Sequence, residues 1–181
     1  MRTMTLKSRI ATISVLASWL ATPVLAATEC RENKNVTASV KSEKDNRDAG
    51  GHVGLHLKDA TAPLPKSGDK SQQGKTAFKD WKTFSEAFGK WNKGGIKPTD
   101  VTVGPRECGT SGSQKDCIKA SALGITEAWT CTEADKKTGI CTTWKPVEGT
   151  LYVGFWYANS KGTGGKWIMN TAYPSTNAEC N

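Results

Sequence analysis

Six cysteines constrain the fold of this 181-residue chain more than any other sequence feature. An even number of cysteines behind an N-terminal export signal predicts disulfide bonds, because export leads to an oxidising compartment. Six cysteines allow fifteen pairings. We expect two bonds that close local loops and one that joins the ends of the domain, namely Cys108–Cys117, Cys131–Cys141 and Cys30–Cys180. A zinc site is not favoured, since no Cys-x-x-Cys pair occurs and neither histidine lies near a cysteine in the sequence.

Residues 1–26 have the features of a secretory signal peptide: a basic start, a short apolar run over Ile10–Leu20 and small residues up to Ala26. The apolar run is too short for a membrane span, which needs about 20 apolar residues. We therefore expect residues 27–181 to form a single secreted or periplasmic domain with no membrane contact. Without the three basic residues of the signal, the formal net charge of +8 falls to +5, which favours an anionic partner.

Hydrophobic periodicity predicts an α+β domain in which an N-terminal helical part packs on a C-terminal antiparallel meander of about four strands. The best helix candidate is Phe78–Trp91, whose aromatic residues recur every three or four positions. Asp80 and Thr83 are the two candidate N-caps, and Lys90 and Lys93 with Gly94-Gly95 suit the helix end. The aromatic stripe favours a core role over base stacking. Alternating residues separated by turns predict the later strands within 119–132, 140–145, 151–157 and 166–173.

Short segments elsewhere give weaker predictions. Val36–Val40 is expected to be a short strand, and the charged stretch Lys41–Asp48 is expected to be solvated. Val101–Val103 predicts another short strand, followed by a loop over Gly104–Cys117. With one helix covering one face of the sheet, we expect the other face to be open to a ligand.

The only two histidines, His52 and His56, follow Gly50-Gly51 and precede Lys58. Two imidazoles can act as general base and general acid in RNA cleavage without a metal, because the ordinary histidine pKa is about 6.5. An ammonium can stabilise the charged phosphorane. The glycines permit a positive φ or close approach to a phosphate. The alternative is a glycine turn before a strand or helix with two exposed histidines.

A second motif closes the chain, Thr171-Ala172-Tyr173-Pro174, in which the threonine and tyrosine share one face of a strand. Together with Gly50-Gly51-His52-Val53-Gly54, this motif resembles the RNase A-like toxin domain of bacterial contact-dependent inhibition proteins. That family belongs to a wider group of small nucleases with early helices and a four-stranded antiparallel sheet. The span between the two motifs covers about two-thirds of the chain.

The resemblance implies metal-independent cleavage of RNA to a 2′,3′-cyclic phosphate, with no cofactor. It assigns catalysis to His52, as general base or general acid, and phosphate positioning to Thr171 and Tyr173. His56 lies outside the usual spacing of the family's paired histidines and would be the partner of His52. The arginine of the family has no counterpart here, so Lys58 or Lys66 would supply the positive charge, and Gly50 and Gly51 would approach the substrate. The protein would be a monomer and RNA its substrate. A cognate immunity protein would be a further partner.

Two other functions fit the same sequence. Small, basic, disulfide-bonded exported proteins with many tryptophans also include inhibitors and glycan-binding proteins that have no catalytic activity. A nuclease fold retained only for binding is the third option, favoured by the missing arginine.

Overall fold

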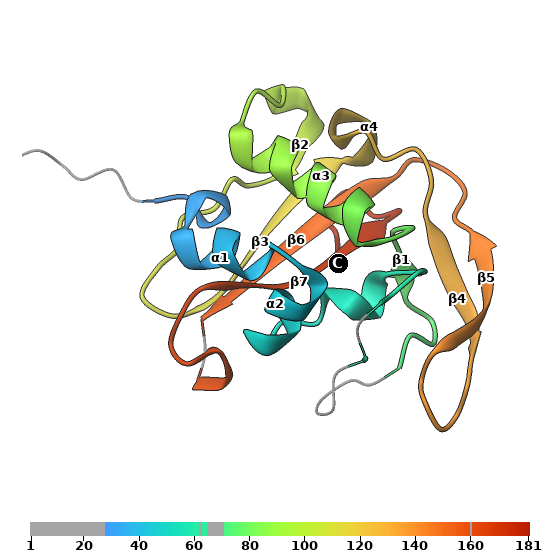
Figure 1. Ribbon diagram of the computed structural model, residues 1–181. Helices are drawn as coiled ribbons and strands as arrows, with labels where there is room; N and C mark the ends of the chain where they lie inside the picture. Colours follow the sequence, from blue (N-terminus) through green and yellow to red (C-terminus); the bar gives the residue numbers. More distant parts are fainter. Residues whose placement is uncertain (1–27, 62, 65–70, 160) are drawn as a thin grey trace, which may run out of the picture.

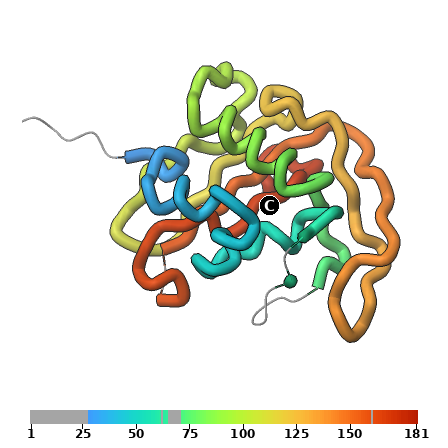
Figure 2. Tube along the Cα trace, in the orientation of Figure 1, coloured from blue at the N-terminus to red at the C-terminus, as the bar shows by residue number. Residues whose placement is uncertain are grey.

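The computed structural model describes residues 28–61, 63–64, 71–159 and 161–181, which form an α+β fold with two antiparallel sheets (Figure 1). One sheet has four strands in the order β2-β3-β6-β7, and the other has three in the order β1-β4-β5. The chain trace shows α1 and α2 beside the last strand and the β4–β5 hairpin at the opposite side of the molecule (Figure 2). The predicted signal peptide and Lys66 lie outside the described residues.

The segment before the histidines is helical, which corrects two predictions. The expected strand at Val36–Val40 is instead part of α1, Lys34–Ser39, because the Asn33 side chain caps the amides of the first turn. The charged stretch that follows forms α2, Glu43–Asp48, which begins at the N-cap Ser42. This helix is not simply solvated, because its Asn46 side chain is buried.

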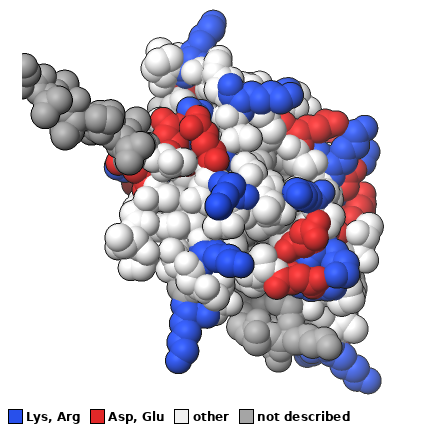
Figure 3. All heavy atoms as spheres, turned by 60° about the vertical axis from the view of Figure 1, so that its left-hand side comes forward, with Lys and Arg blue, Asp and Glu red and all other residues white. Residues whose placement is uncertain are grey.

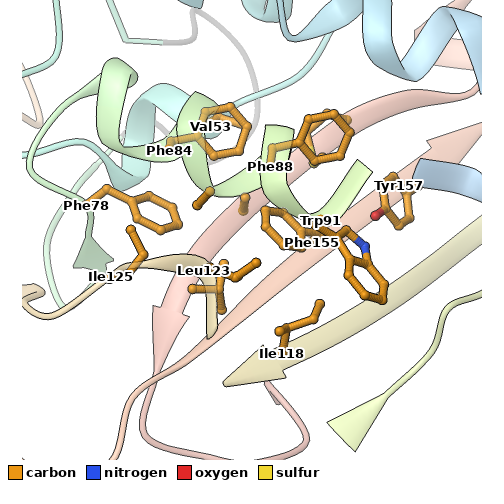
Figure 4. Packing of buried hydrophobic residues seen from close by; sticks show 14 of the residues in the cluster. Val53, Phe78, Phe84, Phe88, Trp91, Ile118, Leu123, Ile125, Phe155 and Tyr157 are labelled. Atoms are coloured by element: carbon orange, nitrogen blue, oxygen red, sulfur yellow. The ribbon is translucent and has the colours of Figure 1, made fainter. Parts of the chain in front are cut away.

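Helix α3, Trp81–Lys93, confirms the helix predicted from aromatic spacing. Asp80 caps it by accepting a hydrogen bond from the Thr83 amide, and Gly94 ends it. The buried side of the helix packs against the four-stranded sheet, where the rings of Phe88 and Phe155 lie 5.6 Å apart (Figure 4). The aromatic stripe therefore belongs to the core, as expected.

The strands confirm an antiparallel sheet but not one continuous meander. The four-stranded sheet consists of β2 Val101–Val103, β3 Gly112–Lys119, β6 Tyr152–Asn159 and β7 Ile168–Ser175. The three-stranded sheet consists of β1 Thr76–Ala77, β4 Trp129–Ala134 and β5 Cys141–Pro146. The β4–β5 hairpin leaves the main sheet because α4, Ala120–Leu123, turns the chain away after β3 and ends at Gly124 with φ +80°. As a result, β3 pairs with β6.

Three disulfides cross-link the described chain, and two of them differ from the predicted pairs. Cys131–Cys141 is confirmed, and it closes the β4–β5 hairpin. The other two bonds are Cys30–Cys108 and Cys117–Cys180. Cys30 reaches Cys108 because residue 30 donates its amide to the Arg106 carbonyl. Cys117 lies on β3 opposite Gly154, against which the Cys180 side chain packs. The prediction that neighbouring cysteines pair was therefore wrong for Cys117, because the fold brings residues 117 and 180 together.

No helix within the described ranges is long and apolar enough to cross a membrane. Together with three disulfides, this finding is compatible with an oxidising compartment.

A buried carboxylate connects α3 with the centre of the main sheet. Asp116 accepts hydrogen bonds from Trp91 Nε1 at 3.0 Å, from the Tyr157 hydroxyl at 2.8 Å and from the Arg106 amide at 2.9 Å. Its side chain is fully buried, and this burial raises the pKa of Asp116 to about 6 despite the three donors. The network holds the helix, two strands and the turn before β3 in one arrangement.

The raised pKa of Asp116 predicts a pH dependence of stability. A carboxyl whose pKa is higher in the folded than in the unfolded chain favours folding most at low pH, and this contribution is lost as the pH rises through about 6. We expect the free energy of unfolding of the wild type, relative to Asp116→Asn, to fall by up to about 3 kcal/mol between pH 4 and pH 7. Urea denaturation of both proteins across this range measures the difference. Parallel profiles would contradict the assignment.

Candidate functional site

The histidine segment lies along the open edge of β7, the strand that carries Thr171 and Tyr173. The His52 amide donates to the Asn170 carbonyl at 2.7 Å. Asn46 holds the same segment in place: its Nδ2 donates to the Met169 carbonyl at 2.7 Å, and its Oδ1 accepts from the Val53 amide at 3.1 Å. The fold therefore brings the first sequence motif against the second, across more than a hundred residues.

The two glycines before His52 allow this close approach. Gly50 has φ +94°, a conformation that L-residues rarely adopt. A Cβ at Gly51 would lie 2.5 Å from both the Met169 carbonyl oxygen and Asn46 Nδ2. Gly51 is thus required for packing against β7, a role that the sequence analysis did not assign to it.

A backbone carbonyl fixes the orientation of the His56 ring. This residue lies at the end of the 3-10 helix η2, Val53–His56, and its Nδ1 is 2.7 Å from the Thr76 carbonyl oxygen. A carbonyl only accepts, so Nδ1 carries a proton, and Nε2 is the basic nitrogen of the neutral ring. The His56 ring packs on the Tyr173 ring, with centroids 5.1 Å apart and planes inclined by 31°.

The Tyr173 hydroxyl is engaged in two hydrogen bonds. It accepts from Trp156 Nε1 at 2.9 Å and donates to the Cys180 carbonyl at 2.8 Å. The side chain is half-buried, and this burial raises the pKa of Tyr173. The Tyr173 phenol proton is therefore used in the hydrogen bond to the Cys180 carbonyl. Tyr173 can donate to a ligand only if this hydrogen bond breaks.

Thr171 and Lys58 complete the residues predicted for the site. Thr171 is 8% exposed, and its Oγ1 has no hydrogen-bond partner among the described residues. A ligand can reach this hydroxyl only after a neighbouring side chain moves. Lys58 lies two residues beyond His56, with its Nζ 4.6 Å from the centre of the Trp129 ring.

The structure thus gathers both histidines, Thr171 and Tyr173 along one strand, whereas the Lys58 ammonium lies over Trp129 of the three-stranded sheet. Sequence reasoning missed three residues that position them: Asn46, Thr76 and Trp156. Asn46 lies in a charged stretch that the sequence analysis expected to be solvated, so no role was predicted for it. Thr76 contributes its backbone carbonyl, and a carbonyl leaves no side-chain signal in the sequence. Within the described ranges no group of three metal-binding side chains occurs.

The space beside His52 is limited. The cavity that His52 lines together with Glu43 and Arg47 has a volume of about 10 Å³, too small for a nucleotide. On the face shown in Figure 3, lysine and arginine side chains stand apart from one another, with acidic side chains between some of them. Binding of a polyanion on that face would depend on individual lysines.

Comparison of the chain with protein-family models, curated proteins and solved structures finds no match. The two short motifs, and the geometry of the strand edge at which they meet, are the features of this chain that bear on its function.

Proposed function

We propose that this protein is a metal-independent endoribonuclease that uses His56 and His52 as its general base and general acid. The observation that carries the proposal is the placement of both histidines at the edge of β7, with the His56 Nδ1–H oriented by the Thr76 carbonyl. A fixed tautomer and a fixed ring orientation are what a general base requires.

In the proposed reaction, Nε2 of His56 takes the proton of the ribose 2′-OH, and the 2′-oxygen attacks phosphorus. The bond from phosphorus to the 5′-oxygen breaks, and the His52 imidazolium protonates that oxygen. The products are a 2′,3′-cyclic phosphate and a free 5′-OH. Lys58 would stabilise the phosphorane charge, although an ammonium lacks the two-pronged geometry of an arginine. Thr171 would bind a phosphate oxygen.

The protein would act after secretion or in the periplasm as a monomer, and a cognate immunity protein would protect the producing cell. The three disulfides support an oxidising location. The +5 net charge of residues 27–181 supports an anionic partner.

A second candidate function is binding or inhibition without catalysis. The observation in its favour is the committed Tyr173 hydroxyl, which the Trp156 and Cys180 bonds occupy. The small cavity beside His52 favours the same alternative.

The deciding experiment treats RNA with the oxidised, purified protein in excess EDTA. We expect cleavage that EDTA does not reduce, fragments that end in a 2′,3′-cyclic phosphate, and no cleavage of a strand whose nucleotides are all 2′-deoxy. Protein prepared in parallel with His56→Ala controls for contaminating nucleases. Intact RNA under all conditions, with stoichiometric capture of a protein or glycan, would favour the second candidate.

A further inference from the structure

A row of side chains crosses the main sheet and ends at the histidine segment. Lys115 on β3 lies opposite Trp156 on β6, and Trp156 lies opposite Thr171 on β7. Residues directly opposite one another in antiparallel strands share a face of the sheet. Beyond Thr171, the next backbone is that of His52, which is bonded to Asn170. The row therefore continues the candidate site across the strands.

Trp156 offers a flat aromatic surface in this row. Its single polar group is already satisfied, because Nε1 donates to the Tyr173 hydroxyl. The side chain is only partly buried, so some of the ring faces solvent. The Nζ of Lys115 lies 5.1 Å from the ring centre. A positive charge beside a partly exposed aromatic ring is the combination that binds single-stranded nucleic acids.

We propose that Trp156 and Lys115 form a subsite for the nucleotide next to the scissile bond, in which the base stacks on Trp156 and its phosphate pairs with Lys115. The proposal rests on the proposed ribonuclease function. The Lys115 ammonium also donates a hydrogen bond to Oδ1 of the exposed residue Asn181. A phosphate can replace both contacts of Lys115, because the attraction of an exposed ammonium to an aromatic ring is weak.

The same geometry specifies the class of substrate. In a duplex, each base is already stacked and paired inside the helix, and its face is not available to Trp156. Unpaired bases can leave the strand and stack on an aromatic side chain. The subsite therefore selects single-stranded RNA and tolerates different bases, since every base has a face that stacks.

The test measures binding of a fluorescent 2′-O-methyl oligonucleotide, which cannot be cleaved, as a single strand and as a duplex. We expect Trp156→Leu to weaken single-strand binding about tenfold or more and to affect duplex binding little. Trp156→Phe keeps an aromatic ring but removes the N–H, and it should retain most of the affinity. Lys115→Met should lower the salt dependence of log K by about 0.7. Trp144→Leu, on β5, is the matched control and should bind like the wild type.

The outcomes separate this inference from the proposed function. Equal losses in Trp156→Leu and Trp156→Phe would trace the effect to the Tyr173 hydrogen bond and overturn the stacking subsite. Wild-type binding by Trp156→Leu, with normal RNA cleavage, would overturn the subsite alone. Binding that depends on Trp156, with no cleavage of unmodified RNA, would support the subsite and contradict the nuclease.

Discussion

Replacing His56 with alanine is expected to slow RNA cleavage about a thousandfold, since a positioned general base contributes roughly 10²–10⁴-fold. The effect follows from the orientation of the imidazole, whose Nδ1 is fixed by the Thr76 carbonyl and whose ring lies against Tyr173. Single-turnover cleavage of a short RNA by wild type and variant measures the loss in the chemical step. His52→Ala should cause a comparable loss, because each imidazole handles a different proton.

A structural role for His56 must be distinguished from a chemical one. His56→Phe keeps an aromatic ring against Tyr173 but lacks both nitrogens, so it should fold and remain inactive. The wild type should show a bell-shaped dependence of cleavage on pH, and each histidine variant should lose one side of that curve. A folded His56→Phe protein that cleaves RNA at the wild-type rate would exclude His56 from the chemistry.

Removing the Cys117–Cys180 disulfide is expected to lower the free energy of unfolding by about 4 kcal/mol, from the loop-closure entropy that this bond removes from the unfolded chain. The bond joins residues separated by 63 positions. Its loss would also release the tail whose Cys180 carbonyl accepts the Tyr173 hydroxyl. Because small domains are stable by only about 5–15 kcal/mol, the double variant Cys117→Ala/Cys180→Ala should unfold at much lower urea concentration.

The hairpin disulfide provides an internal comparison. Cys131–Cys141 spans only 10 positions, so Cys131→Ala/Cys141→Ala should cost about 3 kcal/mol, less than the longer bond. It should leave the candidate site unchanged, because it closes the β4–β5 hairpin. A larger loss from the hairpin variant would show that loop closure does not govern the contribution of these bonds.

Local patterns in the sequence predicted local structure well. Helix α3 follows from aromatic spacing and from the Asp80 cap, and both depend on neighbours within a few residues. The prediction failed at Val36–Val40, where β-branched residues favoured a strand but the Asn33 cap favours a helix. The departure of the β4–β5 hairpin from the main sheet was not predictable, because it depends on how α4 redirects the chain.

The site was predictable only where side-chain types carry the chemistry. The two histidines, Thr171 and Tyr173 were identifiable from motifs, and the structure places them at one strand edge. Their supporting contacts come from a carbonyl and from a buried amide within a charged stretch, neither of which has a sequence signature. Disulfide pairing was equally hidden, since it reflects strand order.

The two long disulfides close successive loops that do not overlap, 30–108 and 117–180. The histidines belong to the first ring, and Thr171 and Tyr173 belong to the second. Among the residues that the structure describes, the segment 109–116 is the only covalent link between the two rings, and residues 109–112 are exposed. A protease cut in this linker would leave two closed pieces whose reassembly depends on packing alone. Each piece carries only part of the candidate site, so the site forms only when the two pieces associate.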